Sequence, residues 1–170
     1  MFRVGIITAS DKGSRGERED LSGAALRELV REIDGEVVEY VVLPDDRDLL
    51  AAKMREWADE RHLDLILTTG GTGFSPRDVT PEATLAVAER MVPGIAEVMR
   101  AESLKVTPKA MLSRAIAALR NYTLIINMPG SPKAVRECWA AIAPALPHGI
   151  EILKGAASEC AEPVSPEGGL

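Results

Sequence analysis

The chain has 170 residues, which is most simply the length of one domain. Hydrophobic residues make up 46% of it and aromatic residues only 4%, so we expect a core of aliphatic side chains. The formal charge of −6 argues against a nucleic-acid surface, and no apolar run has the length of a signal peptide or a membrane span.

In the first half of the chain, apolar runs alternate with helical patterns. Residues 2–9 are predicted to form a buried strand, and residues 22–33 a helix whose apolar side chains share one face. Residues 36–43 form the next predicted strand, and a helix is expected over residues 47–60. This order is typical of a parallel sheet with helical connections.

The most informative segment follows a third predicted strand, residues 65–69. Residues 70–73 read Gly-Gly-Thr-Gly, and three glycines in four positions let the backbone approach a ligand closely. Thr80 is the predicted N-cap of a helix over residues 81–91, which has a proline at its first position. A strand, a glycine loop and a helix start form the usual geometry of a phosphate site. The segment matches neither a P-loop nor a dinucleotide fingerprint, and a plain tight turn is the alternative.

The second half of the chain contains a similar loop. A helix is expected over residues 94–104 and a fourth strand over residues 124–128. Residues 127–133 then read Asn-Met-Pro-Gly-Ser-Pro-Lys, which offers backbone N–H groups at a helix start, a hydroxyl and a cation. The helix that begins there should reach residue 142, and a last helix is expected over residues 144–153. Two such loops suit a substrate with two phosphorylated ends.

The predicted architecture is α/β, with three α/β/α layers: a mostly parallel sheet with helices on both faces. The domain should span residues 1–155, and residues 156–170 should form a flexible C-terminal tail. Cys138 and Cys160 have no metal-binding spacing and form no disulfide framework, which favours a cytoplasmic location.

In open α/β sheets, ligands bind beyond the carboxyl ends of the strands. Asp45 and Asp78 follow different strands, so both carboxylates are expected in one crevice. Mg²⁺ between them would have hard oxygen ligands and would bridge phosphate oxygens. Capping of the helix after residue 46 is an alternative role for Asp45 and Asp46. The cations best placed to neutralise phosphate are Arg77, Arg114 and Lys133, with a solvated charge as the alternative for the two arginines.

Several short motifs occur in one order along nearly the whole chain, up to about residue 155. They are Ser10-Asp11, Asp20-x-Ser22-Gly23, Leu43-Pro44-Asp45, residues 68–73 and 77–83, Pro93-Gly94, Leu112-Ser113-Arg114, and residues 127–133. With these motifs the chain resembles the MogA/MoaB-type molybdopterin-binding domain, which also occurs in plant Cnx proteins and gephyrin. The chain departs from the usual pattern at Ala118 and Asn121, where relatives commonly carry glycine.

The resemblance implies a molybdopterin adenylyltransferase of molybdenum cofactor biosynthesis. Such an enzyme transfers AMP from ATP to the terminal phosphate of molybdopterin with Mg²⁺, and gives adenylyl-molybdopterin and pyrophosphate. The resemblance also implies a homotrimer, or a hexamer in some members, and a downstream MoeA-type partner that inserts molybdate.

The resemblance implies that Asp45 and Asp78 are the essential acidic residues and that Ser113 takes part in catalysis. The role of the two aspartates as metal ligands is the hypothesis drawn above from their place after the strands. Apart from the resemblance, Ser113 would be interpreted as a helix cap. The expected substrate-binding residues are Ser10, Asp11, Thr69, Gly70, Gly71, Thr72, Gly73, Arg77, Arg114, Asn127, Pro129, Gly130, Ser131 and Lys133.

Two other functions stay open. A non-catalytic MoaB-type carrier would bind molybdopterin without using ATP, although the presence of both aspartates and Ser113 argues against it. A scaffold domain would use its trimer surface to bind partner proteins.

Overall fold

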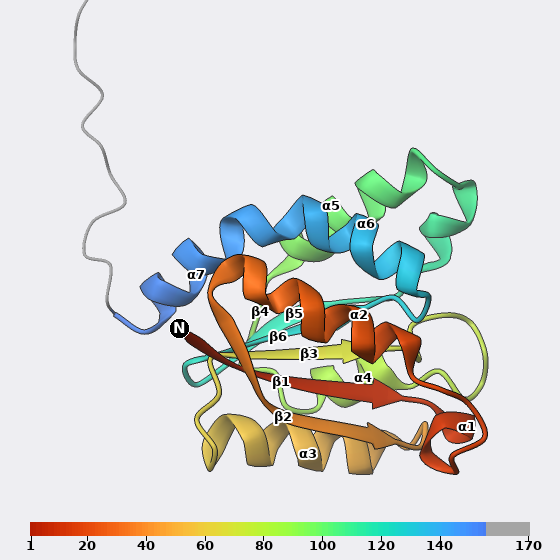
Figure 1. Cartoon of the computed structure of the whole chain (residues 1–170), viewed down its shortest axis with the longest axis horizontal. Coiled ribbons are helices and arrows are strands. Elements are labelled where there is room, and N and C mark those ends of the chain that lie inside the picture. Colours follow the sequence, from red (N-terminus) through yellow and green to blue (C-terminus); the bar gives the residue numbers. More distant parts are fainter. Residues whose placement is uncertain (156–170) are drawn as a thin grey trace, which may run out of the picture.

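The four predicted strands are present in the computed structural model, which describes residues 1–155. They are β1 (Phe2–Ala9), β2 (Gly35–Leu43), β3 (Leu65–Thr69) and β6 (Thr123–Met128). They lie side by side in the order β2-β1-β3-β6, and all three pairings are parallel (Figure 1). All residues of β3 and β6 are buried, as expected for strands that are covered on both faces. The predicted tail, residues 156–170, lies outside the described residues.

Two short strands that were not predicted extend the sheet beyond β6. They are β5 (Ala117–Arg120) and β4 (Arg90–Met91), and both of their pairings are antiparallel. The helix predicted over residues 81–91 is therefore wrong beyond residue 85, where α4 (Thr80–Leu85) ends. The backbone after α4 pairs with β5 instead: the N–H of Glu89 donates to the carbonyl of Leu119 at 2.9 Å.

Helices cover both faces of the sheet, which confirms the three-layer prediction (Figure 1). One face carries α2 (Leu21–Leu29), α5 (Pro93–Leu104), α6 (Pro132–Ile142) and α7 (Leu146–Leu153), and the other carries α3 (Arg47–Asp59) and α4. Strand β1 contributes Val4 and Ile6 to the first core and Ile7 to the second, because successive side chains of a strand point to opposite faces.

The remaining elements are short. They are the helix α1 (Asp11–Ser14) and the 3₁₀ turns η1 (Val30–Ile33), η2 (Pro108–Leu112) and η3 (Ala143–Ala145). No helix within residues 1–155 is both long enough and apolar enough to cross a membrane.

The helix starts next to the loops show which caps were predicted correctly. Asp46 caps α3 by accepting hydrogen bonds from two backbone N–H groups, and Ser131 caps α6 by accepting one at 3.1 Å. The predicted cap at Thr80 is wrong, since Val79 precedes the helix and its side chain accepts no hydrogen bond. The hydroxyl of Thr80 is fully buried and donates to the carbonyl of Gly70 at 2.9 Å. Thr80 therefore fastens the glycine loop.

Candidate active site

The carboxyl ends of β1, β2, β3 and β6 open onto one cleft of about 600 Å³. Its walls come from loops that are far apart in the sequence but converge at this edge of the sheet. Of the residues expected in the site, the cleft brings together Ser10, Asp45, Thr69, Gly70, Gly71, Asp78, Gly130 and Ser131. The four loops therefore share one space.

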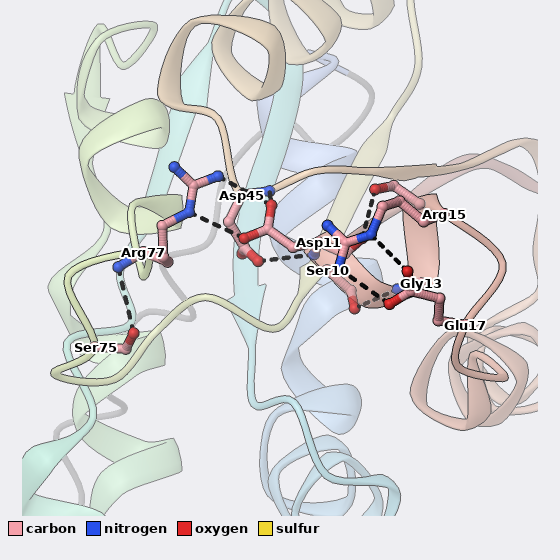
Figure 2. Close-up of polar contacts among 9 residues, drawn as sticks. Ser10, Asp11, Gly13, Arg15, Glu17, Asp45, Ser75 and Arg77 are labelled. Carbon is pink, nitrogen blue, oxygen red and sulfur yellow. Dashed lines mark hydrogen bonds and ion pairs between the residues drawn. The ribbon is translucent and has the colours of Figure 1, made fainter.

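Three of these loops are joined by hydrogen bonds between charged residues (Figure 2). The backbone N–H of Asp11 donates to the Asp45 carboxylate, and the N–H of Asp45 donates to the Asp11 carboxylate, each at 3.0 Å. The guanidinium of Arg77 donates a forked pair of hydrogen bonds to the Asp11 carboxylate, from Nε to Oδ2 and from Nη2 to Oδ1, both at 3.0 Å. Asp11 thus connects the loops that follow β2 and β3.

The carboxylates of the cleft have different electrostatic environments. The hydrogen bond from Arg77 holds the pKa of Asp11 below its usual value. Burial raises the pKa of Asp45, and the negative charges of Asp11 and Asp78 add to this effect. Asp45 therefore carries a charge that the surrounding protein does not fully compensate, which favours a cation beside it.

The donor set fits a hard divalent cation. No cluster of three or more His, Cys, Asp or Glu side chains able to hold a metal occurs within residues 1–155. Mg²⁺ commonly takes only one or two protein carboxylates and completes its shell with water and substrate phosphates. Asp45 and Asp78 are the two carboxylates of the cleft that would hold such an ion.

The first glycine loop brings its backbone very close to the aspartates. Gly71 has a φ of +68°, and a Cβ on it would lie 2.3 Å from the Thr80 hydroxyl and 3.2 Å from an Asp45 carboxylate oxygen. Asp78 is fixed within the same loop, since one of its carboxylate oxygens accepts the N–H of Ser75 at 3.0 Å. Only glycine allows this close approach with a positive φ.

The second glycine loop lies against the first. The hydroxyl of Thr69 donates to the carbonyl of Pro129 at 2.7 Å, and a Cβ on Gly130 would lie 3.4 Å from the Cα of Gly70. Ser131 lines the cleft while it caps α6. The side chain of Lys133 is 78% exposed and lies 3.9 Å from Glu137 at their nearest charged atoms, outside the cleft lining. A phosphate contact of Lys133 stays a prediction.

Asn127 is fully buried and is not among the residues that line the cleft. Its amide nitrogen donates to the hydroxyls of Thr68 at 3.0 Å and Thr84 at 2.8 Å, and its oxygen accepts the N–H of Ile116. These contacts join β6, β3, α4 and the segment before β5. The structure therefore gives Asn127 a structural role, and a substrate contact stays a prediction.

Ser113 and Arg114 lie beyond the glycine loop rather than in the lining of the cleft. Ser113 follows η2 and lines a neighbouring cavity of about 220 Å³, together with Pro129 and Cys138. The next residue, Arg114, donates its backbone N–H to the carbonyl of Thr72 at 2.9 Å. The segment with Ser113 is thereby attached to the loop that carries Asp78.

Asp20 was given no role from the sequence, yet it lines the cleft. Its carboxylate accepts hydrogen bonds from the hydroxyls of Thr8 and Tyr40, and it caps α2 by accepting the N–H of Gly23 at 2.8 Å. An aspartate directly before the predicted helical pattern was the available signal for the cap. The contact with Tyr40 on β2 could not be read from that local pattern.

A family model for a probable molybdopterin binding domain matches residues 5–148. The chain belongs to this family. The resemblance inferred from the motifs is therefore confirmed, and the probable molybdopterin binding domain accounts for most of the described fold.

Individual members of the family are similar over nearly their whole length. The molybdopterin adenylyltransferase of Helicobacter pylori strain J99 is 46% identical over 156 residues, which cover 91% of this chain and 89% of that protein. The molybdopterin adenylyltransferase of Escherichia coli K12 is 37% identical over 177 residues, covering 96% and 91%. The crystal structure of the molybdopterin biosynthesis enzyme MoaB from Thermus thermophilus matches with a TM-score of 0.86 at 52% identity, covering 91% and 98%.

Proposed function

We propose that this protein is a molybdopterin adenylyltransferase, which transfers AMP from ATP to the terminal phosphate of molybdopterin. The observation that carries the proposal is the placement of Asp45 and Asp78 in one cleft with two glycine loops. Similarity to proteins named molybdopterin adenylyltransferase over nearly the full length supports the same activity. The product would be adenylyl-molybdopterin, an intermediate of molybdenum cofactor biosynthesis.

The reaction requires positioning more than it requires a strong base. A phosphate monoester is already a nucleophile at neutral pH, so an oxygen of the molybdopterin phosphate attacks the α-phosphorus of ATP in line. The new P–O bond forms as the bond to the bridging oxygen breaks, and pyrophosphate leaves with that electron pair. The protein contributes alignment and neutralisation of charge, as in phosphoryl transfer generally.

Each part of the cleft has a defined task in this proposal. Asp45 and Asp78 would hold Mg²⁺, which when bound neutralises negative charge on the ATP phosphates. The backbone N–H groups of the glycine loop and the N-terminus of α6 at Ser131 would bind phosphate oxygens. Arg77, beside Asp11, would supply a cation, and the family resemblance implies that Ser113 orients the substrate.

The test is pyrophosphate release from a mixture of protein, molybdopterin, ATP and Mg²⁺. We expect turnover by the native protein and a loss of about 10²-fold or more in Asp78→Asn, because one electrostatic contact to the reacting phosphates is lost. Full turnover in both Asp45→Asn and Asp78→Asn would refute the metal-ligand roles.

Isothermal titration separates an enzyme from a carrier. A carrier would bind molybdopterin but would neither bind nor consume ATP, whereas the proposed enzyme binds both. We further propose, from the family resemblance, a homotrimeric cytoplasmic protein that passes its product to a MoeA-type partner. Light scattering on the purified protein tests the trimer.

A further inference from the structure

The guanidinium group of Arg114 contacts both the segment 73–78 and helix α4. Its Nε donates to the carbonyl of Gly73 and its Nη2 donates to the carbonyl of Asp78, both at 2.7 Å. Its Nη1 forms an ion pair with Glu82 in the first turns of α4. One side chain therefore bridges the two ends of the segment 73–78 and connects it to a helix.

Apart from the two hydrogen bonds of Arg77 to Asp11, the segment 73–78 has little other support. Residues 74–77 are exposed, so they make few packing contacts that would hold the loop in one conformation. The hydrogen bonds between Ser75 and Asp78 lie within the loop and would move with it. Asp78 is therefore fixed relative to Asp45 by contacts to other parts of the protein, which are those of Arg114 and the hydrogen bonds of Arg77 to Asp11.

The backbone that flanks Arg114 is held by hydrogen bonds from α5. The guanidinium of Arg100 on α5 donates to the carbonyl of Ala115 at 2.8 Å and to that of Ser113 at 3.4 Å. These contacts place the backbone on either side of Arg114. The loop is thus supported by a short series of contacts from α5, through the segment 113–115, to Gly73 and Asp78.

The charge of Arg114 is also balanced within the protein. Burial by itself raises the pKa of Glu82, but the hydrogen bond from Arg114, a backbone hydrogen bond and the positive charges of Arg114 and Arg47 together outweigh it, and the net effect is a lowered pKa. Glu82 is therefore an anion at neutral pH beside the guanidinium. Three of the five N–H donors of the Arg114 guanidinium are therefore used within the protein, and its positive charge is paired with Glu82.

We infer that Arg114 is a positioning residue, which holds Asp78 in place through the backbone of the glycine loop and acts on the reaction only through that loop. The inference rests on the proposed function for the role of Asp78. The claim that Arg114 holds the loop in one conformation concerns the protein alone and does not depend on that function. A planar fork can reach two carbonyls and a carboxylate together, whereas the single nitrogen of lysine cannot.

The experiment compares Arg114→Lys with Arg120→Lys. Arg120 is a matched control because it also forms a fork, on Asp59, and donates to a backbone carbonyl, that of Val87, but at the opposite edge of the sheet. Hydrogen exchange is first measured on each protein without substrate. We expect faster exchange of amides in residues 71–80 for Arg114→Lys and unchanged exchange there for Arg120→Lys.

Kinetic measurements then test whether the reaction depends on the positive charge at residue 114 or on the forked shape of the guanidinium. If Arg114 positions Asp78, Arg114→Lys lowers kcat by about 10- to 100-fold, the usual loss when a partner of a metal ligand is removed, and raises the Mg²⁺ concentration needed for half-maximal rate. If Arg114 binds phosphate directly, Arg114→Lys retains kcat and raises the KM for ATP, which would overturn the inference. Unchanged exchange in the glycine loop would also overturn it.

A milder variant covers the case in which Arg114→Lys does not fold. Glu82→Gln removes the ion pair but leaves the two carbonyl contacts, so exchange of the same amides should rise by a smaller factor. Unchanged exchange in Glu82→Gln, with Arg114→Lys unfolded, would count against the inference. Absence of adenylyl transfer by the native protein would refute the proposed function. The hydrogen-exchange results would still show whether Arg114 holds the loop in place.

Discussion

Asp11 and Asp45 each accept the backbone N–H of the other at 3.0 Å, so the two carboxylates fix each other's loops. The arrangement keeps Asp45 beside other negative charges, because its position is set by backbone groups and not by a cation of its own. The fork of Arg77 on Asp11 relieves only part of this repulsion. A bound cation would therefore lower the electrostatic repulsion between the carboxylates of this site.

The variant Asp45→Asn should separate stability from activity. The raised pKa of Asp45 means that the folded protein disfavours the ionised carboxylate. Protonated Asp45 therefore adds to the free energy of unfolding below the ordinary pKa of 3.8, and this stabilisation is lost as the pH rises through the pKa of Asp45 in the folded protein. At neutral pH we therefore expect a higher Tm for Asp45→Asn than for the native protein, together with a loss of turnover of about 10²-fold or more. Thermal unfolding and pyrophosphate release measure the two effects.

The control is Asp46→Asn, one residue along the chain. Asparagine caps a helix as well as aspartate does, so α3 should keep its start and turnover should be retained. A lower Tm for Asp45→Asn would show that the Asp45 charge stabilises the fold, against our expectation.

The close approach at Gly71 predicts strong sensitivity to a single methyl group. Gly71→Ala places Cβ 2.3 Å from the Thr80 hydroxyl in a backbone with positive φ, so either the loop or Thr80 must move. We expect destabilisation of about 1–3 kcal/mol and a loss of most activity, measured by chemical denaturation and turnover. Gly149→Ala is the control: apart from neighbouring residues of its own helix, no atom lies within 4 Å of the added Cβ, and α7 should gain about 0.5–1 kcal/mol.

Tyr40 should titrate unusually late. Burial and the hydrogen bond to Asp20 raise its pKa to about 12 from an ordinary value of 10.0. The fold therefore favours the neutral phenol, and the stability it contributes is present below pH 10.0 and is lost as pH rises towards 12. Ultraviolet titration of the native protein minus Tyr40→Phe should show a group with a pKa of about 12.

Asp20, which accepts the hydrogen bond of Tyr40, predicts a further effect of Tyr40 on stability at acid pH. Burial raises the pKa of Asp20, but the hydrogen bonds from Thr8, Tyr40 and Gly23 outweigh it and leave the pKa lowered. Tyr40→Phe should therefore cost about 0.5–1 kcal/mol at neutral pH, since Tyr40 is partly exposed, and stability should fall at a higher pH on acidification. Equal unfolding curves for the variant and the native protein would contradict this account.

Asn127 should behave as a structural residue. Asn127→Ala leaves the N–H of Ile116 and two threonine hydroxyls without their buried partner, which should cost about 2 kcal/mol or more. Activity per folded molecule should change little, because the side chain is fully buried and does not line the cleft. A fall in kcat with unchanged stability would instead indicate contact with substrate, as the sequence interpretation had it.

The long apolar strands were predictable because each carries enough buried residues to give a local signal. Strands β4 and β5 were missed because two and four residues are too few to show a period, and β4 is wholly exposed. Its pairing with β5 depends on backbone groups rather than on residue type. The same reason explains why the helix after Thr80 was predicted to be too long.

The candidate site divides in a similar way. Asp45 and Asp78 could be placed together because each lies in the loop that follows a strand of one sheet. Arg114 was predicted to bind phosphate, and this stays a prediction; two of its partners in the structure are backbone carbonyls, which any residue type can provide. Local sequence therefore locates a charged side chain better than it identifies the groups that the side chain contacts.

The contact between the two glycine loops has a consequence for protein engineering. Because Thr69 donates to Pro129 and Gly130 leaves almost no space above Gly70, neither loop can change shape independently. Grafting one of them from a relative with a different substrate preference would introduce a steric conflict with the other. A chimaera should therefore exchange residues 69–80 and 127–133 together, as a single transplanted unit.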